Sequence, residues 1–193
     1  LELDGGYLTA RLVGRAARIV LSSPLARELP FVQPDGSDPG AVARATERNR
    51  DVIRSAGVGR WLPGYVLRAA RGRVTEEGRL VQCRNVRRPL GFAGFGLVTV
   101  LTVDVERGLE PIDSDAIVSD GRVVYASRSS LYVATDRWDR SAVPMAPSTG
   151  LHRFDIASPT QTHYRSSGTV PGVLLGQWSL SERSANAPAM AST

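Results

Sequence analysis

Hydrophobic and polar residues alternate in short runs over most of the chain, and the runs end at Gly, Pro, Asp or Ser. Such runs predict β-strands joined by turns, because successive side chains of a strand point to opposite faces of its sheet. Residues 7–22 predict a hairpin, in which YLTARLV and ARIVLSS flank a turn at Gly14-Arg15. Residues 97–105, LVTVLTVDV, are apolar at most positions and predict a strand that is buried on both faces.

Four further strands are predicted over residues 115–118, 122–127, 131–137 and 151–156. Four antiparallel strands within about 40–45 residues are typical of one β-propeller blade. Residues 131–135 are expected to form a central strand of this blade, with both faces buried. The runs at residues 164–169 and 174–180 are expected to start the next blade.

Residues 24–94 interrupt this pattern, with prolines at 24, 30, 34 and 39. Asp38 followed by Pro39 predicts the start of a helix, because Asp caps helices well and Pro suits the first helical position. Gly57 is placed to end the helix. Val42, Ala45, Val52, Ile53 and Ala56 fall roughly on one stripe, which we expect to pack against the sheet.

These patterns predict an all-β fold: a partial β-propeller of about two to three four-stranded antiparallel blades, with one helix-bearing insertion. Residues 1–182 are assigned to this domain, and residues 24–94 to the insertion within it. Residues 183–193 contain Ala, Ser, Pro and Met without a strand pattern, so we expect a disordered tail.

Several phrases of the chain resemble a known family when taken in order: GLEPIDSDAIV, VVYASRSSLYVATDRW and SGTVPGVLLGQWSLSE. The family comprises bacterial and archaeal secreted proteins with a β-propeller domain, and the resemblance spans about residues 1–182. It implies an extracellular or cell-surface location, for some members as lipoproteins, with the signal or lipid anchor outside this chain. It supplies no catalytic residues. Because the family phrases continue beyond both ends, we expect the chain to be a fragment.

The positive charge is concentrated in one segment. All 24 basic residues are Arg, and residues 41–88 hold twelve of them against four acidic residues. Arg84, Arg87 and Arg88 are therefore candidate contacts for an anionic partner. No aromatic residue lies between Arg68 and Arg88, as base stacking on a nucleic acid would require. We expect a solvated surface there, without specific nucleic-acid binding.

Residues that could carry catalysis are few. The chain has one cysteine, Cys83, and two histidines, His152 and His163, and it lacks a G-x-S-x-G motif. Cys83 is expected to be a buried thiol or half of a disulfide whose partner lies outside this chain. A cleft that joins His152 to Asp113 and Asp115 would favour a hydrolase.

Asp113, Asp115 and Asp120 offer oxygen ligands of the kind that Ca²⁺ takes. Their spacing does not match a helix-loop-helix calcium site, and Asp in turns more often bonds its own backbone. Calcium is the one cofactor that the sequence suggests.

Four aromatic residues follow the predicted strands: Tyr125, Tyr132, Trp138 and Trp178. At alternating strand positions such rings more often form the core between blades than a ligand groove. We expect Tyr125 and Tyr132 in the core, and we take Trp138, which follows a strand, as a candidate partner contact.

The expected function is that of a non-enzymatic exported scaffold that binds a protein or an extracellular polymer. The alternatives are a hydrolase whose active site needs blades missing from this chain, and a non-functional gene fragment. No run of 18 apolar residues occurs, so no transmembrane segment is predicted.

Overall fold

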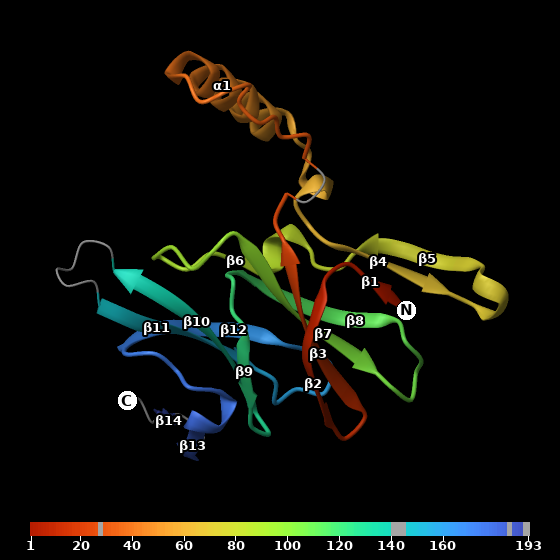
Figure 1. Ribbon diagram of the computed structural model, residues 1–193. Helices are drawn as coiled ribbons and strands as arrows, with labels where there is room; N and C mark the ends of the chain where they lie inside the picture. The colour runs from red at the N-terminus through yellow and green to blue at the C-terminus, as the bar shows by residue number, and fades with distance from the viewer. Residues whose placement is uncertain (27–28, 140–145, 185–186, 191–193) are drawn as a thin grey trace.

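A computed structural model describes residues 1–26, 29–139, 146–184 and 187–190 of the chain. The described strands form four sheets, and one helix stands apart from them (Figure 1). We number the sheets from the first to the fourth in the order in which they stack.

The first sheet has the strand order β1 (Glu2–Leu3), β4 (Gly64–Arg68), β5 (Val74–Arg79). The second has the order β2 (Gly6–Val13), β3 (Ala16–Pro24), β7 (Gly96–Asp104), β8 (Pro111–Val118), β6 (Val86–Arg87). The third has the order β12 (His163–Pro171), β11 (Ala146–Asp155), β10 (Ser130–Asp139), β9 (Val123–Ala126). The fourth pairs β13 (Leu180–Ser184) with β14 (Ala187–Met190). The helices are α1 (Pro39–Ser55) and the 3₁₀ turns η1 (Val58–Arg60), η2 (Ala70–Gly72), η3 (Cys83–Asn85) and η4 (Gln177–Ser179).

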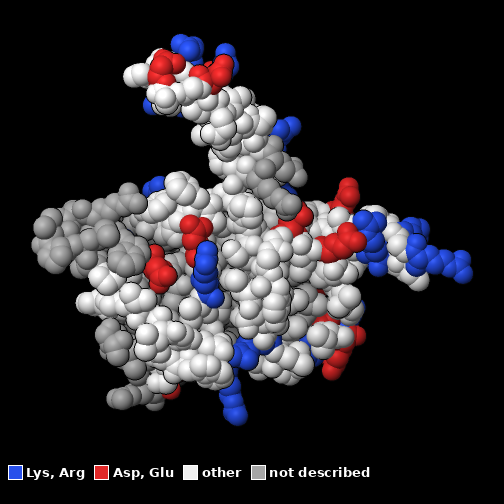
Figure 2. Space-filling model, in the orientation of Figure 1, with Lys and Arg blue, Asp and Glu red and all other residues white. Residues whose placement is uncertain are grey.

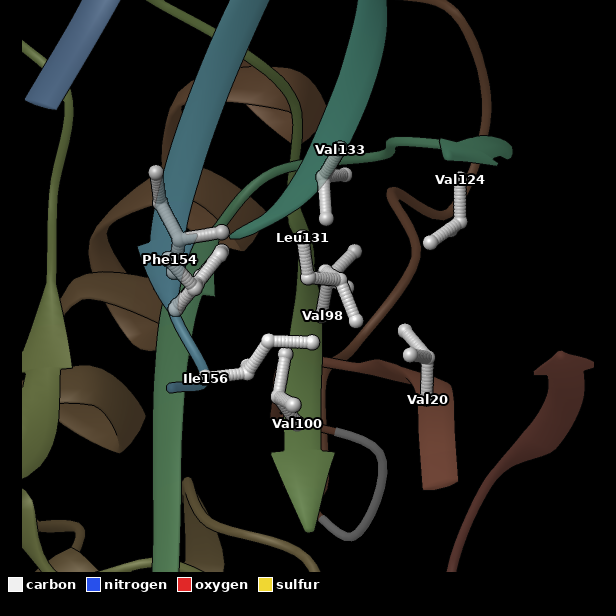
Figure 3. Close-up of a cluster of buried hydrophobic side chains, with 9 residues drawn as sticks. Val20, Val98, Val100, Val124, Leu131, Val133, Phe154 and Ile156 are labelled. Carbon is white, nitrogen blue, oxygen red and sulfur yellow. The ribbon is translucent and has the colours of Figure 1, made fainter. Parts of the chain in front are cut away.

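The second and third sheets stack face to face through the main hydrophobic core. Val20, Val98 and Val100 of the second sheet meet Leu131 and Val133 of the third (Figure 3). Each of the two sheets contains four antiparallel strands, as in propeller blades, and β6 adds a short parallel strand to the edge of the second. The predicted all-β, partial β-propeller fold is thereby confirmed.

Two further clusters extend the stack on either side. Leu3 and Tyr65 of the first sheet pack with Leu21 and Leu101 of the second. On the other side, Ala134 of the third sheet packs with Leu174 and with Leu180 of β13. The middle strands of the second and third sheets are therefore covered on both faces.

Strands in the middle of these sheets are buried on both faces, as the apolar runs predicted. Every residue of β7 is buried. In β10, Leu131 and Val133 face the second sheet, whereas Ala134 belongs to the cluster on the opposite face. The buried Tyr132 donates from its hydroxyl to Glu182 Oε1 at 3.1 Å, which links the third sheet to β13.

One strand of the predicted blade belongs to a different sheet in the structure. The sequence suggested that residues 115–118 open the blade that continues to residue 156. In the structure they belong to β8, which pairs with β7 in the second sheet, and the third sheet instead ends with β12. Strand runs alone do not show which neighbour a strand pairs with, because pairing depends on contacts distant in sequence.

Residues 25–95 connect the ends of two neighbouring strands of the second sheet, β3 and β7. Strands β3 and β7 pair along their whole length, from Ala16↔Asp104 to Pro24↔Gly96. The segment between them holds α1, the β4–β5 hairpin and β6. It is more than a helical insertion, because β4 and β5 join β1 as the first sheet.

Helix α1 follows the capping signals but not the expected packing. Asp38 caps it by accepting from Gly40 N at 2.8 Å and Ala41 N at 3.0 Å. The helix projects from the body (Figure 1), and Val42 and Ile53 of its apolar stripe are 44% and 45% exposed. The expectation that the stripe packs against the sheet is therefore wrong.

A neighbouring loop supplies the contact of α1 instead. The Asn49 amide donates to Val32 O at 2.9 Å and accepts from Val32 N at 2.8 Å. The short side chains of Ala41 and Ala45 are buried on the helix.

The tail also differs from the expectation. Residues 187–190 form β14, whose register against β13 runs from Leu180↔Met190 to Ser184↔Ala187. Backbone pairing with β13 makes these residues a strand even though their side chains show no strand pattern. The remaining tail positions 185–186 and 191–193 lie outside the described residues.

Arg18 is the largest fully buried side chain between the second and third sheets. Its guanidinium donates to Ser158 O and, at 3.2 Å, to Gln161 O, in the connection from β11 to β12. Next to it in the sheet, the hydroxyls of Thr102 and Thr162 lie 3.1 Å apart. This polar group ties the connection to the second sheet.

Candidate functional site

A hollow of about 300 Å³ lies between the loop that follows β6 and strands β10, β11 and β12 of the third sheet. The loop contributes Arg88 and Leu90, and the sheet contributes Arg137, His152 and Ser167. In Figure 1 this loop, in light green, runs beside the far ends of β10 and β11.

A β-bulge builds the sheet side of the hollow. His152 pairs with Ser167 across β11 and β12, and Phe154 pairs with Tyr164. Tyr164 and Ser167 are three residues apart, so in a regular strand they would face opposite sides of the sheet. The register shift between Arg153 and Phe154 adds one residue to β12 and brings both side chains to the face of His152.

A chain of hydrogen bonds passes through the buried His152. Its Nδ1 bonds Ser167 Oγ, and its Nε2 lies 3.2 Å from Thr135 Oγ1. The Thr135 hydroxyl donates to Gly150 O at 3.3 Å, so it accepts from Nε2–H. Nδ1 then accepts from the Ser167 hydroxyl, and the Tyr164 hydroxyl, 2.7 Å away, donates to Ser167 Oγ.

This arrangement holds the imidazole in its neutral form. Burial, reinforced by the positive charge of Arg137, lowers the pKa of His152 from 6.5 to about 4. All the hydrogen bonds of His152 described above form with the neutral imidazole and need no second proton on the ring. His152 is thus uncharged at neutral pH.

The charge of the hollow is positive. Its lining includes Arg88 and Arg137, and the described lining residues include no Asp or Glu. Arg137 Nη1 donates to Thr169 Oγ1 at 2.8 Å. A Cβ at Gly91 would clash with the Arg137 guanidinium, so this glycine leaves room for it beneath the loop.

The same loop exposes a group of apolar side chains. Leu90 is fully exposed, Phe92 is 68% exposed and Phe95 is 77% exposed. The rings of Phe92 and Phe95 meet edge to face with centroids 5.0 Å apart. We call these three residues the apolar loop surface, and it adjoins the hollow because Leu90 belongs to both.

The base of this loop is fixed by Asp120. Its Oδ2 accepts from Phe95 N at 3.1 Å, and its own N–H donates to Ala93 O at 2.8 Å. Gly94, with φ of 123°, adopts a backbone conformation that favours glycine, and a Cβ there would clash with the Asp120 carboxylate. Asp120 therefore holds the backbone of the loop from beneath.

The three candidate calcium ligands are not gathered into one site. Asp113 Oδ2 accepts from Thr162 N at 2.6 Å, and Asp115 Oδ2 accepts from Tyr164 N at 2.8 Å. Burial is the main cause that raises the pKa of Asp115. Asp120 bonds the loop instead, and no group of three or more metal-ligating side chains occurs among the described residues. Each carboxylate thus has a backbone partner in a segment distant in sequence, so the interpretation that these Asp residues bond their own turns is wrong.

The predicted partner contacts are only partly brought together. Arg84, Arg87 and Arg88 are all exposed, and of these Arg88 lines the hollow. Arg87 donates to Arg84 O. The backbone of Trp138 lies one residue before the end of β10, opposite Pro147, but its side chain lies outside the described part of the chain.

The structure confirms the expected position of Tyr125 and Tyr132 but not the expected burial of Cys83. Cys83 is exposed, so the interpretation as a buried thiol is wrong. Tyr132 is buried and Tyr125 packs beside it, with ring centroids 6.1 Å apart, as expected for core residues. Trp178 is 87% exposed.

The pair of Ser167 and His152 has the elements of a nucleophile and a base, but its properties disfavour that chemistry. A general base works best with a pKa near the operating pH, whereas that of His152 is lowered to about 4. The second ring nitrogen, Nε2, bonds the hydroxyl of Thr135, whereas in a catalytic triad a carboxylate takes this position. Asp113 and Asp115 bond backbone N–H groups and do not orient His152. The hollow is better suited to binding an anion than to hydrolysis.

Comparison with known proteins gives one family. A family described as "Beta propeller domain" matches residues 1–187. No curated protein and no solved structure matches the chain. A separate search of the described residues finds no helix with the length and apolar character needed to cross a membrane.

Proposed function

The chain belongs to the beta propeller domain family, and on that basis we propose that it is an exported binding scaffold that recognises another protein. One observation supports this most: the apolar loop surface of Leu90, Phe92 and Phe95 is exposed beside a basic hollow. Large exposed apolar side chains that lie together mark interaction surfaces more often than isolated ones do.

Protein is favoured over carbohydrate by the composition of the loop. Sugar sites combine aromatic faces with polar groups that bond hydroxyls, whereas residues 89–95, PLGFAGF, carry no polar side chain. Apolar side chains of a partner protein would fit this surface, with Phe92 and Phe95 as its aromatic anchors.

A random-peptide display library panned on the purified chain tests the proposal. We expect enriched peptides that bind the native chain and bind at least tenfold more weakly to a variant carrying Leu90→Ser, Phe92→Ser and Phe95→Ser. A second variant, Tyr7→Ser with Leu12→Ser, removes exposed apolar groups from β2 and should bind normally. Failure to enrich any peptide would overturn the proposal, and binding to a polysaccharide panel would then point to a polymer ligand.

Export is part of the same proposal and rests on the resemblance to secreted proteins. Fractionation of the source cells, with detection by antibody, tests it. Accumulation in the cytosolic fraction alone would contradict it.

A further inference from the structure

We infer that the hollow beside the apolar loop surface is a carboxylate-binding pocket that receives an acidic side chain of the partner protein. This inference rests on the proposed function and specifies the chemistry of its partner: an Asp or Glu next to apolar residues. It is carried by the charges, the hydrogen-bond donors and the shape of the hollow.

The lining of the hollow carries positive charge and no negative charge among its described residues. Arg88 and Arg137 both line the hollow, and no acidic residue is among its described lining. His152 adds no charge at neutral pH, because burial and Arg137 keep it neutral. A carboxylate entering the hollow would therefore meet two guanidinium groups, whose planar donors match its two oxygens.

Several other Arg residues lie at the β4–β5 hairpin and do not line the hollow. In Figure 2 the blue side chains gather at the β4–β5 hairpin, close to red ones. There Arg68 pairs with Glu2, with Nε–Oε1 at 2.8 Å. Within the described part of the chain, the Arg88 side chain forms no hydrogen bond or ion pair, so its charge is available to a ligand.

Positioning of the donors comes second. Arg137 is fixed at 2.8 Å from Thr169 Oγ1 and lies against Gly91. The hydroxyls of Tyr164 and Ser167 already donate within the network that ends at His152, which leaves the guanidinium groups as the donors for the ligand. Donors that are held in place before binding cost less side-chain entropy when the ligand arrives.

The connection to the apolar loop surface comes third. Leu90 lies at the rim of the hollow and is also fully exposed. A partner segment that seats its carboxylate between Arg88 and Arg137 would therefore lay the adjoining residues on Leu90, Phe92 and Phe95. The hydrogen bonds that pass through the buried His152 hold the floor of the pocket in place.

The peptides enriched on the native chain provide the test. We expect them to contain Asp or Glu flanked by apolar residues, and we expect the matching Asn or Gln peptide to bind at least tenfold more weakly. Arg88→Gln should weaken binding about tenfold, as loss of a charge-assisted hydrogen bond does. Arg71→Gln, at the exposed β4–β5 hairpin, is the matched control and should leave affinity unchanged.

Gly91→Ala gives a second route to the same result. It keeps both Arg residues but forces the Arg137 guanidinium to move. We expect weaker binding to acidic peptides with little change in the melting temperature, because the displaced atoms are the end of a flexible side chain.

The outcomes separate the two proposals. Peptides that bind through Phe92 but lack acidic residues, and that ignore Arg88→Gln, would overturn the carboxylate pocket and leave the protein-binding function intact. No peptide binding would overturn both. Binding of polygalacturonate that depends on Arg88 would replace the protein partner with an acidic polysaccharide.

Discussion

Val133 has no solvent-exposed surface and lies between the second and third sheets. An Asp at this position would be buried without a partner, which is among the largest penalties that one substitution causes. We expect Val133→Asp to lower the free energy of unfolding by about 3 kcal/mol or more, and to leave little soluble chain. Thermal melts and soluble yield measure this, with Leu12→Asp, at a 63% exposed position of β2, as the control. A soluble Val133→Asp variant with native melting would contradict the assignment of β10 to the core.

His152 should make the stability depend on pH. Its pKa is about 4 in the folded chain against 6.5 in its ordinary state, so the folded state disfavours the added proton. The stability that depends on neutral His152 is therefore fully present above pH 6.5 and is lost as the pH falls from 6.5 to 4. Because one pKa unit corresponds to about 1.4 kcal/mol, the loss is at most about 3 kcal/mol.

Urea unfolding of the native chain and of His152→Gln between pH 7 and pH 4 measures this difference. We expect the native chain to lose more stability than the variant over this range. His163→Gln, which replaces an exposed histidine, should behave like the native chain. Parallel pH curves for the native chain and His152→Gln would show that His152 has no such role.

The pocket itself could not be predicted at the level of residues. His152 was a candidate, but Ser167 and Tyr164 become its neighbours through the cross-strand register and the bulge at Arg153/Phe154. A bulge changes which residues share a face, and the alternation of polar and apolar residues does not show it. The run PLGFAGF at residues 89–95 was the available signal for the apolar loop surface, because three large apolar residues there fit no strand.

At the scale of elements, α1 combines strong local signals with weak tertiary contacts. Asp38 satisfies two N–H groups of its first turn, and Ala at such a position costs about 1 kcal/mol of helix stability. We expect Asp38→Ala to speed amide hydrogen exchange in the first turns of α1 and to leave exchange in β7 and β10 unchanged. Asp35→Ala, in the exposed loop before the helix, is the control. Equal loss of protection in α1 and in the sheets would mean that the helix unfolds together with the body.

Elements were predictable where their determinants are local. The cap at Asp38, the turn at Gly14 and the apolar run of β7 each lie within a few residues of the structure that they specify. The assignment of β8 to a sheet and the packing of α1 failed, because both depend on partners elsewhere in the chain. The strand β14 was missed for the same reason, since it is defined by its pairing with β13.

At the scale of the whole molecule, the stacked sheets end in a surface that favours association. Beyond the third sheet, Leu175 and Trp178 are 75% and 87% exposed near β13. Exposed apolar side chains beside strands promote contact between chains. We expect the 193-residue chain to associate as its concentration rises, and Leu175→Ser with Trp178→Ser to reduce this association. Sedimentation velocity over a range of concentrations measures it, with Tyr7→Ser as the control; association that is equal in all three chains would contradict this role of the two residues.

The direct pairing of β3 with β7 also has a consequence for the order of folding. Strands β3 and β7 can pair only after residues 25–95 close as one loop between Pro24 and Gly96. In an unstructured chain, closing such a loop costs about 2.5 kcal/mol more than closing a four-residue turn. The third sheet needs no such closure between β9 and β10, because only residues 127–129 separate them. We therefore expect β9 and β10 to fold early, and their apolar face to serve as the template on which β3 and β7 meet.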